Sequence, residues 1–264
     1  MGIFSNFRTP KPAVIEFAPL FEGLDEYCAP QPAIKFFPDW YKQMSLRVGG
    51  AHQSDIPVHD RHLPEGKTIK SCPAISDLFK VGYVLPLWTD FSIEVQEGGG
   101  FDWHSGNPRH EIQFHGPQQL AVESTRPNEL NYVVKFVSPW RFRAPKDHLI
   151  LLKGLFYHTD APFRVCEGIL DGSVTSTMNV NTFWSAKPAK HLLKRNSALA
   201  VMIPFPKHAY EALIHSDPAI ARRWDERNKT MLFDTFDNNY RQLTDRRLNK
   251  LFGWRKAHPG RRDS

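Results

Sequence analysis

Short apolar segments recur between Asn131 and Ile203, and turn-forming residues separate them at intervals of about eight to fifteen positions. This rhythm is typical of an antiparallel β-sandwich or barrel. The chain also holds many aromatic residues (12%) and 21 prolines, which favours short strands and punctuated loops over long helices. The expected strands are Tyr132–Val137, Trp140–Arg143, Leu149–Leu152, Phe163–Cys166, Val174–Trp184 and Leu199–Ile203.

Different patterns on either side of this region divide the 264 residues into three parts. Residues 1–66 alternate short apolar runs with prolines and predict a proline-rich wrap. Residues 67–207 hold the apolar segments and predict the β-sandwich core. Residues 208–264 read as a basic helical extension. The predicted fold is therefore α+β, with an antiparallel sandwich or jelly-roll-like core and a C-terminal helical extension.

Within the first two parts, prolines and glycines mark the ends of the expected elements. Pro38 and Pro73 can each occupy the first turn of a short helix, since that position needs no amide hydrogen. Phe91–Val95 alternates as a half-buried strand, and Gly98–Gly100 is the expected hairpin connection after it. In the extension, His208–His215 predicts one short helix, followed by a longer helix from Pro218 and another over Asn238–Leu251.

The net charge of +6 lies entirely in the C-terminal segment. Residues 219–264 contain 12 Lys or Arg and 6 Asp or Glu, so the rest of the chain is neutral. A basic segment can attract nucleic acid or an acidic partner through electrostatics that carry no sequence information. The simpler interpretation is a solvated helix face, because opposite charges are interspersed.

The N-terminus has no apolar stretch of signal-peptide length, and no run approaches the roughly 18 apolar residues of a membrane span. The three cysteines, Cys28, Cys72 and Cys166, are widely spaced, which favours reduced thiols. The sequence thus predicts a cytoplasmic protein without a membrane partner.

A polar stretch between residues 102 and 115 contains the candidate metal ligands His104, His110, Glu111 and His115. Mononuclear iron sites use two histidines and a carboxylate, and zinc sites also use histidines. Residues two apart in a strand share a face, so Asp102 lies beside His104, and His115 reaches them if residues 107–108 form a hairpin turn. The alternative is a polar hairpin with exposed histidines, because the order Asp-x-His differs from the His-x-Asp of the oxygenases. Fe(II) or Zn is the expected cofactor of the first interpretation.

A second candidate site involves Arg141 and Arg143, which alternate with Trp140 and Phe142. Arginine beside aromatic residues can bind a carboxylate or phosphate bidentately. The same alternation is expected of a strand with one buried and one wet face, and in that interpretation both arginines only face solvent.

Five blocks of the chain resemble, in order and spacing, a phage and bacterial family catalogued as a domain of unknown function, DUF6065. The blocks are Thr68–Pro73 with Asp77, Gly82-Tyr83 and Pro86–Asp90; His115–Gln118; Lys135-Phe136 with Pro139-Trp140 and Ala144-Pro145; Pro162-Phe163 with Gly168–Asp171; and Ile203–Phe205. The resemblance covers residues 13–207. This chain lacks the family's second aspartate after Asp171 and the Lys-Gly-Thr-Pro before the final strand. The resemblance implies a fold and a phage or prophage origin, without a known activity.

The strand Gly168–Asp171 is also similar to the Gly-Val-Ile-Asp strand of the dUTP pyrophosphatases, which lines their uracil and sugar pocket. That resemblance implies a ligand-binding role for Asp171. The Ser-Gly phosphate loop and the tyrosine that follow in such a site are absent here. A strand bend at Gly168 and a turn-forming Asp171 are the simpler interpretation.

Two functional hypotheses follow. One is a small-molecule-binding protein or metal-dependent, oxygenase-like enzyme, with a pocket at the mouth of the sandwich that uses His104, His110, Glu111 and His115. The other is a structural or interaction protein, cytoplasmic or virion-associated, whose sandwich is a scaffold and whose basic tail binds a protein partner. The hypotheses differ in whether the histidines and Glu111 converge in one concave site.

Overall fold

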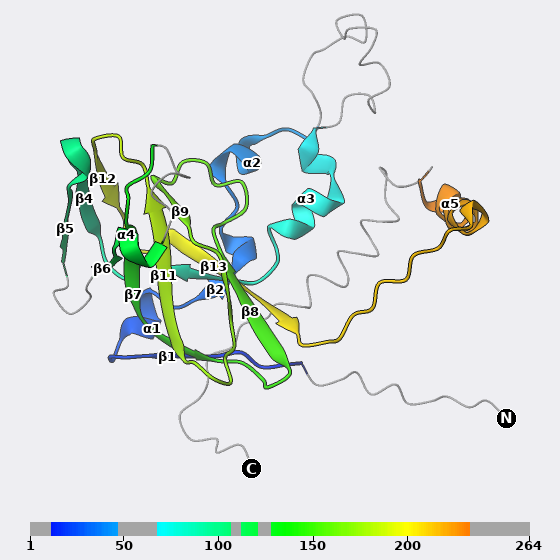
Figure 1. Ribbon diagram of the computed structural model, residues 1–264, viewed down its shortest axis with the longest axis horizontal. Helices are drawn as coiled ribbons and strands as arrows, with labels where there is room; N and C mark the ends of the chain where they lie inside the picture. Colours follow the sequence, from blue (N-terminus) through cyan, green and yellow to red (C-terminus); the bar gives the residue numbers. More distant parts are fainter. Residues whose placement is uncertain (1–11, 47–67, 107–111, 121–127, 233–264) are drawn as a thin grey trace, which may run out of the picture.

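Antiparallel sheets dominate the molecule, as the spacing of the apolar segments predicts. The structure is a computed structural model that describes residues 12–46, 68–106, 112–120 and 128–232. Two five-stranded sheets and one three-stranded sheet build the body, short helices flank it, and a helix near the C-terminus lies apart from it (Figure 1). The α+β, sandwich-like fold with a C-terminal helix is confirmed.

The strands pair in three groups, and all pairs are antiparallel. The first sheet has the order β1-β7-β11-β9, with β6 also on β7, and contains β1 (Glu16–Pro19), β6 (Ile112–His115), β7 (Val133–Arg143), β9 (Phe163–Val165) and β11 (Thr177–Trp184). The second sheet has the order β10-β8-β13-β3-β2 and contains β2 (Gln31–Pro32), β3 (Tyr83–Pro86), β8 (His148–Lys153), β10 (Gly168–Leu170) and β13 (Ala198–Pro206). The third sheet has the order β12-β4-β5 and contains β4 (Phe91–Val95), β5 (Phe101–Ser105) and β12 (Ala189–Leu193).

Strand β7 is longer than the sequence predicts, because it runs through Ser138 and Pro139 without a break. Proline cannot donate a ladder hydrogen bond, so it is tolerated in a sheet where the pairing is irregular. The register between β7 and β11 shifts between Thr177 and Asn179 at this point. The extra residues lie in β7, where Arg141 pairs with Thr177 and Val137 with Asn179, and this irregular pairing lets two predicted strands become one.

Large aromatic side chains fill the space between the sheets. Trp140, Trp184 and Phe136 are buried almost completely. The indole Nε1 of Trp184 donates to Thr182 Oγ1 (2.9 Å), and that of Trp140 donates to the Cys28 carbonyl oxygen (3.1 Å). Burial of each such side chain contributes roughly 1.5–3 kcal/mol relative to exposure, provided its polar atom keeps a partner. Both tryptophans meet that condition.

Short helices connect and cover the strands. They are α1 (Leu24–Tyr27), α2 (Asp39–Gln43), α3 (Pro73–Leu78) and α4 (Pro117–Leu120), with 3₁₀ turns at Ala33–Lys35, Ile69–Ser71 and Glu97–Gly99. The longer helix α5 (Pro218–Leu232) lies apart from the sheets. The helices expected after Pro38 and at Pro73 are confirmed. Within the described ranges, no helix is long and apolar enough to cross a membrane.

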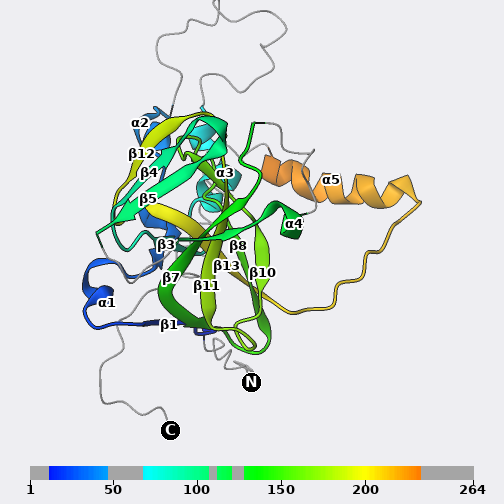
Figure 2. The same ribbon diagram turned by 60° about the vertical axis from the view of Figure 1, so that its left-hand side comes forward.

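The predicted helix over His208–His215 is wrong. Residues 207–217 form no regular element, and they lead from β13 to α5 as an exposed linker. An eight-residue helix is marginal in water unless an apolar face packs against another element, and the apolar residues of this segment are exposed. We call residues 207–232 the C-terminal arm. Both Figure 1 and Figure 2 show the arm leaving the end of β13 and carrying α5 clear of the sheets.

Candidate functional site

The described candidate metal ligands lie on two different sheets. His104 is exposed on β5 opposite Ser92, whereas His115 ends β6 opposite Val133. The expected hairpin pairing of these two strands is therefore wrong, because β5 pairs with β4 and β6 pairs with β7. His115 Nδ1 lies 3.2 Å from Gln119 Oε1.

His110 and Glu111 lie outside the described residues. Among the residues that are described, no three His, Cys, Asp or Glu side chains gather closely enough to hold a metal ion. The iron or zinc hypothesis therefore stays a prediction.

Arg141 and Arg143 lie on the solvent-facing side of β7, as expected of a strand with one buried and one exposed face. Trp140 and Phe142 are buried, Arg141 is half-buried and Arg143 is exposed. Arg141 donates from Nη1 to the carbonyl oxygens of Ser138 (3.1 Å) and Trp140 (3.2 Å). The Arg141 guanidinium thus binds backbone oxygens of its own strand. A role of either arginine in ligand binding stays a prediction.

Asp171 forms a turn after β10, as the simpler interpretation of the sequence predicts. Its Oδ1 accepts hydrogen bonds from the Ser173 amide (3.0 Å) and hydroxyl (2.6 Å), and its Oδ2 pairs with Lys207 Nζ. The ion pair with Lys207 and the bonds from Ser173 lower the pKa of the Asp171 carboxyl to about 2. Because Lys207 is the first residue of the arm, this pair fixes the arm's origin to the body.

A groove with a volume of about 940 Å³ lies at one end of the sandwich. It lies where β8 and β9 are joined, beside the end of β12 and the start of β13. Buried Leu87, Val165 and Leu199 lie at its base. Tyr157 and Leu192, which are exposed, line it as well. The groove therefore combines exposed apolar side chains with a base formed by buried core residues.

Cationic side chains outnumber acidic ones around this groove. The lining residues with charged side chains are Lys35, Lys42, Lys153, Arg164 and Lys194 on one side and Asp39, Asp160 and Glu167 on the other. Lys153 is the least exposed of the paired cations: its ammonium lies 4.2 Å from the centre of the Phe156 ring and 3.5 Å from a Glu167 oxygen. Four of the five cations form ion pairs, Lys42 with Asp39, Lys153 with Glu167, Arg164 with Glu129 and Lys194 with Asp90. With these carboxylates included the charges at the groove balance, and its apolar base is the feature that suits a ligand.

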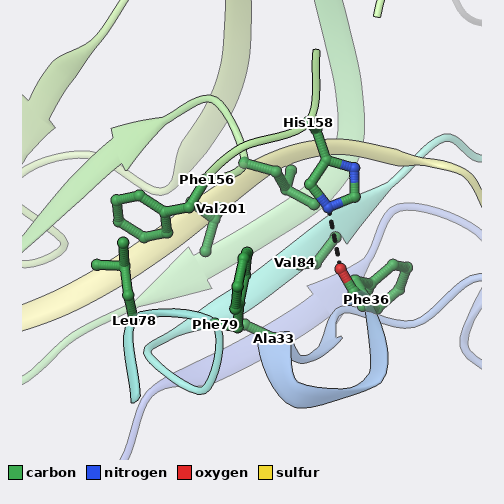
Figure 3. A pocket seen from close by; sticks show the side chains of 9 residues that line it. Ala33, Phe36, Leu78, Phe79, Val84, Phe156, His158 and Val201 are labelled. Carbon is green, nitrogen blue, oxygen red and sulfur yellow. Dashed lines mark hydrogen bonds between the residues drawn. The ribbon is translucent and has the colours of Figure 1, made fainter. Parts of the chain in front are cut away.

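Two hydrogen bonds fix the loop that forms one wall of the groove. His158 Nε2 donates to the Phe36 carbonyl oxygen (3.0 Å), and Trp40 Nε1 donates to the Tyr157 carbonyl oxygen (3.0 Å). Figure 3 shows the His158 bond above a small apolar pocket that Phe79 and Val84 also line. That pocket holds about 10 Å³, roughly the space of one water molecule. The N-terminal wrap and the loop are therefore held together at the groove.

Aromatic rings reinforce the same junction. Phe79 lies with its ring centre 4.6 Å from that of Tyr41 and 5.9 Å from that of Tyr157. Tyr157 also adopts a left-handed backbone conformation (φ 56°), which costs a non-glycine residue about 1–2 kcal/mol. Such strain persists only where the surroundings enforce it, and it is common at functional loops.

The arm carries a group of exposed apolar residues. Tyr210, Leu213, Ile214 and Trp224 are 82%, 76%, 87% and 55% exposed. The ring pairs that involve them stay within the arm: His208 lies 6.3 Å from Tyr210, and His215 lies 5.8 Å from Trp224. Soluble proteins expose single apolar residues routinely, but a group of this kind usually marks an interaction surface.

The sequence predicts a pocket at the mouth of the sandwich and a C-terminal tail that binds a partner, but it identified neither the residues of this groove nor the exposed apolar residues of the arm. The groove combines residues from positions 35 to 199, and only the pairing of strands brings them together. For the arm, a usable signal existed: residues 208–217 contain Tyr210, Leu213 and Ile214 but lie beyond the last predicted strand, where no sheet remains to cover them.

Comparisons with known proteins give no family. The sequence matches no model of a known protein family and no curated protein. The resemblance to DUF6065 therefore stays a prediction. Among solved structures, the native dUTPase of EIAV is similar over 52% of this chain and 84% of its own length, with 12% identity and a TM-score of 0.29. A likeness at that level carries no argument about fold or function.

Proposed function

We propose that this protein is an interaction protein, in which the β-sandwich is a scaffold that holds the C-terminal arm out toward a protein partner. The observation that carries the proposal is the exposure of Tyr210, Leu213, Ile214 and Trp224 on a segment that leaves the body. An apolar group in water is unfavourable by about 25 cal/mol per Å², and covering it provides the driving force of most protein association.

The distribution of the described residues favours this function over a metal-dependent enzyme. His104 and His115 lie on different sheets, so the described part of the metal hypothesis has no convergent site. The DUF6065 resemblance implies a phage or bacterial setting, where a virion or host-interaction scaffold is one role for such a protein. The basic segment would support nucleic-acid binding, but residues 208–217 of the arm carry no Lys or Arg.

The experiment that tests the proposal places a photo-reactive amino acid at position 213 of the full chain, in cells of the organism that makes the protein. A matched control carries the same group at Val174, an apolar residue of the body that is 83% exposed. We expect a discrete cross-linked protein from position 213 and none of comparable yield from position 174. Equal yields from both positions would contradict the proposal.

The groove favours a second candidate function, the binding of a largely apolar small molecule. Its volume of about 940 Å³ lies within the 300–1,000 Å³ of typical ligand sites. A ligand at 100 times its Kd would stabilise the fold by about 2.7 kcal/mol. Thermal unfolding with a panel of aromatic compounds would show this as a shift that Leu192→Asp reduces, since Leu192 is an exposed apolar residue of the groove. A shift that Leu192→Asp leaves unchanged would place the ligand elsewhere.

A further inference from the structure

We propose that residues 246–264, the terminal segment, bind single-stranded nucleic acid through its phosphate backbone, without sequence preference. The terminal segment lies outside the described residues, and its charge and chemistry follow from the sequence. This inference goes beyond the proposed function, because the terminal segment contains none of the exposed apolar residues that carry that function.

The whole net charge of the protein lies in the terminal segment. Its cations are Arg246, Arg247, Lys250, Arg255, Lys256, Arg261 and Arg262. Its one acidic side chain is Asp263, so the segment has a net side-chain charge of +6. Residues 219–245, by contrast, contain five Lys or Arg and five Asp or Glu. The interspersed opposite charges that are typical of a solvated helix face are therefore confined to residues 219–245.

The body of the protein does not supply the missing negative charge. Residues 1–218 contain 22 basic and 22 acidic side chains. Five carboxylates of the body already have a Lys or Arg nitrogen within 3.5 Å, and they are Asp90, Glu94, Glu129, Glu167 and Asp171. The body is thus neutral as a whole and has no excess of either sign to compete with the terminal segment for a polyanion.

The arm carries the chain away from this neutral body. Both Figure 1 and Figure 2 show α5 clear of the sheets, and residues 233–245 separate α5 from the terminal segment. Arg222 and Arg223 on α5 are exposed, and neither forms an ion pair with a residue that the structure describes. These two arginines form an adjacent pair like Arg246 and Arg247, but they belong to a stretch whose charges balance. The chain therefore contains its own matched control.

The chemistry of the terminal segment favours nucleic acid among polyanions. Five of its seven cations are arginines, and a guanidinium binds a phosphate with two hydrogen bonds where an ammonium acts as a point charge. Phe252 and Trp254 stand among these cations. Aromatic side chains beside cations are the surfaces on which the bases of a single strand stack.

The same composition disfavours a membrane surface as the ligand. Residues 255–264 contain four of the seven cations and no large apolar side chain. A cationic segment anchors stably in a bilayer when apolar side chains or an acyl chain insert as well. This half of the terminal segment has groups that bind phosphate and none that insert.

The first part of the test measures binding of the full chain to a fluorescent single strand of about 20 nucleotides, by anisotropy at several salt concentrations. Seven phosphate contacts predict a slope of about −5 when the logarithm of the association constant is plotted against that of the salt concentration. The affinity should therefore fall roughly 1,000-fold between about 50 and 200 mM salt. Binding that does not depend on salt, or no binding at the lowest salt concentration, would overturn the inference.

The second part compares two variants that each lose two positive charges. In Arg246→Gln with Arg247→Gln, the slope should become shallower by about 1.4, and the affinity at about 0.1 M salt should fall roughly 25-fold. In Arg222→Gln with Arg223→Gln, the affinity should change less than about threefold, because charges farther apart than about 10 Å are largely screened at that salt concentration. Equal losses would overturn the inference, since the net charge of the whole chain would then govern binding. Circular dichroism and thermal unfolding verify that both variants fold.

The third part replaces the oligonucleotide with vesicles of phosphatidylcholine that contain about one fifth phosphatidylserine, an anionic lipid of cytoplasmic leaflets. We expect the full chain to bind the oligonucleotide more tightly than the vesicles at equal phosphate concentration. Tighter binding to the vesicles would overturn the inference and assign the terminal segment to a membrane surface.

Discussion

Tryptophan occurs in two contrasting regions of this molecule. Trp184 lies between the sheets without exposed surface, with its ring centre 5.2 Å from that of Phe101 and 5.3 Å from that of Phe163. Trp224 lies on the arm and is 55% exposed. The same residue type thus stabilises the fold in one region and remains available in the other. Apolar residues become core only where the topology supplies a facing surface, and those without one indicate a partner.

The largest expected effect is the difference in unfolding free energy between variants of these two tryptophans. Trp184→Ala removes a buried side chain, so we expect the free energy of unfolding to fall by about 3–5 kcal/mol. Trp224→Ala removes an exposed one, and we expect a change within about 0.5 kcal/mol when the protein is dilute. Urea unfolding of both variants at low concentration measures the difference. A loss above about 2 kcal/mol for Trp224→Ala would mean that the arm belongs to the core.

The next prediction compares alanine substitutions at two glycines of similar backbone conformation, one in a packed part of the body and one in open space. Gly82 (φ 89°) and Gly98 (φ 77°) both lie in the left-handed region, where alanine costs about 1–2 kcal/mol. A methyl group at Gly82 would overlap the Met202 carbonyl on β13, whereas nothing lies within 4 Å at Gly98. Gly82→Ala should therefore lose about 1–3 kcal/mol more than Gly98→Ala in urea unfolding. Equal losses would show that β3 and β13 can separate without penalty.

A smaller effect concerns the junction of body and arm. The pKa of Asp171 is about 2 in the folded protein, below the ordinary value of about 3.9 that the unfolded chain retains. The unfolded chain therefore binds the proton first as the pH falls, and the stabilisation by Asp171, complete above about pH 4, is lost as the pH falls through about 2. Asp171→Asn should show a shallower loss of unfolding free energy between pH 4 and pH 2. An unchanged slope would mean that Lys207 does not hold this carboxylate in solution.

The smallest effect concerns the exposed histidine on the body. His104→Ala should change the free energy of unfolding by no more than about 0.5 kcal/mol, because the side chain is exposed on β5. Elemental analysis of untagged protein, supplied with iron and zinc, gives the second readout. Near-stoichiometric metal that disappears in a folded His104→Ala, His115→Ala variant would support the metal site and move the functional centre from the arm to the body.

The strands were predictable because their evidence is local. Alternation in Phe91–Val95 and the turn at Gly98–Gly100 predict β4 and its hairpin, and both are confirmed. Short β10 was identified as the strand Gly168–Asp171, whereas β12 carries little alternation of its own and was missed. The failed helix at His208–His215 has a different cause. Its periodicity is helical, but helix formation in a short segment depends on packing that the isolated chain does not provide.

The candidate site was less predictable than the fold. Motifs drew attention to His104 and His115, which nevertheless belong to different sheets, since strand pairing is not encoded in the spacing of two histidines. The groove depends on contacts between distant segments, such as the bond from His158 to Phe36. Local patterns contain no information on such contacts, so the groove could be found only from the structure.

The central claim, that the C-terminal arm binds a protein partner, is tested most directly by photo-cross-linking from position 213, with position 174 of the body as the control. The account predicts a discrete cross-linked protein from position 213 and none of comparable yield from position 174, because the arm groups its exposed apolar residues whereas Val174 is a single exposed residue of the body. Equal yields from both positions would contradict it, because the arm would then have no preferred partner.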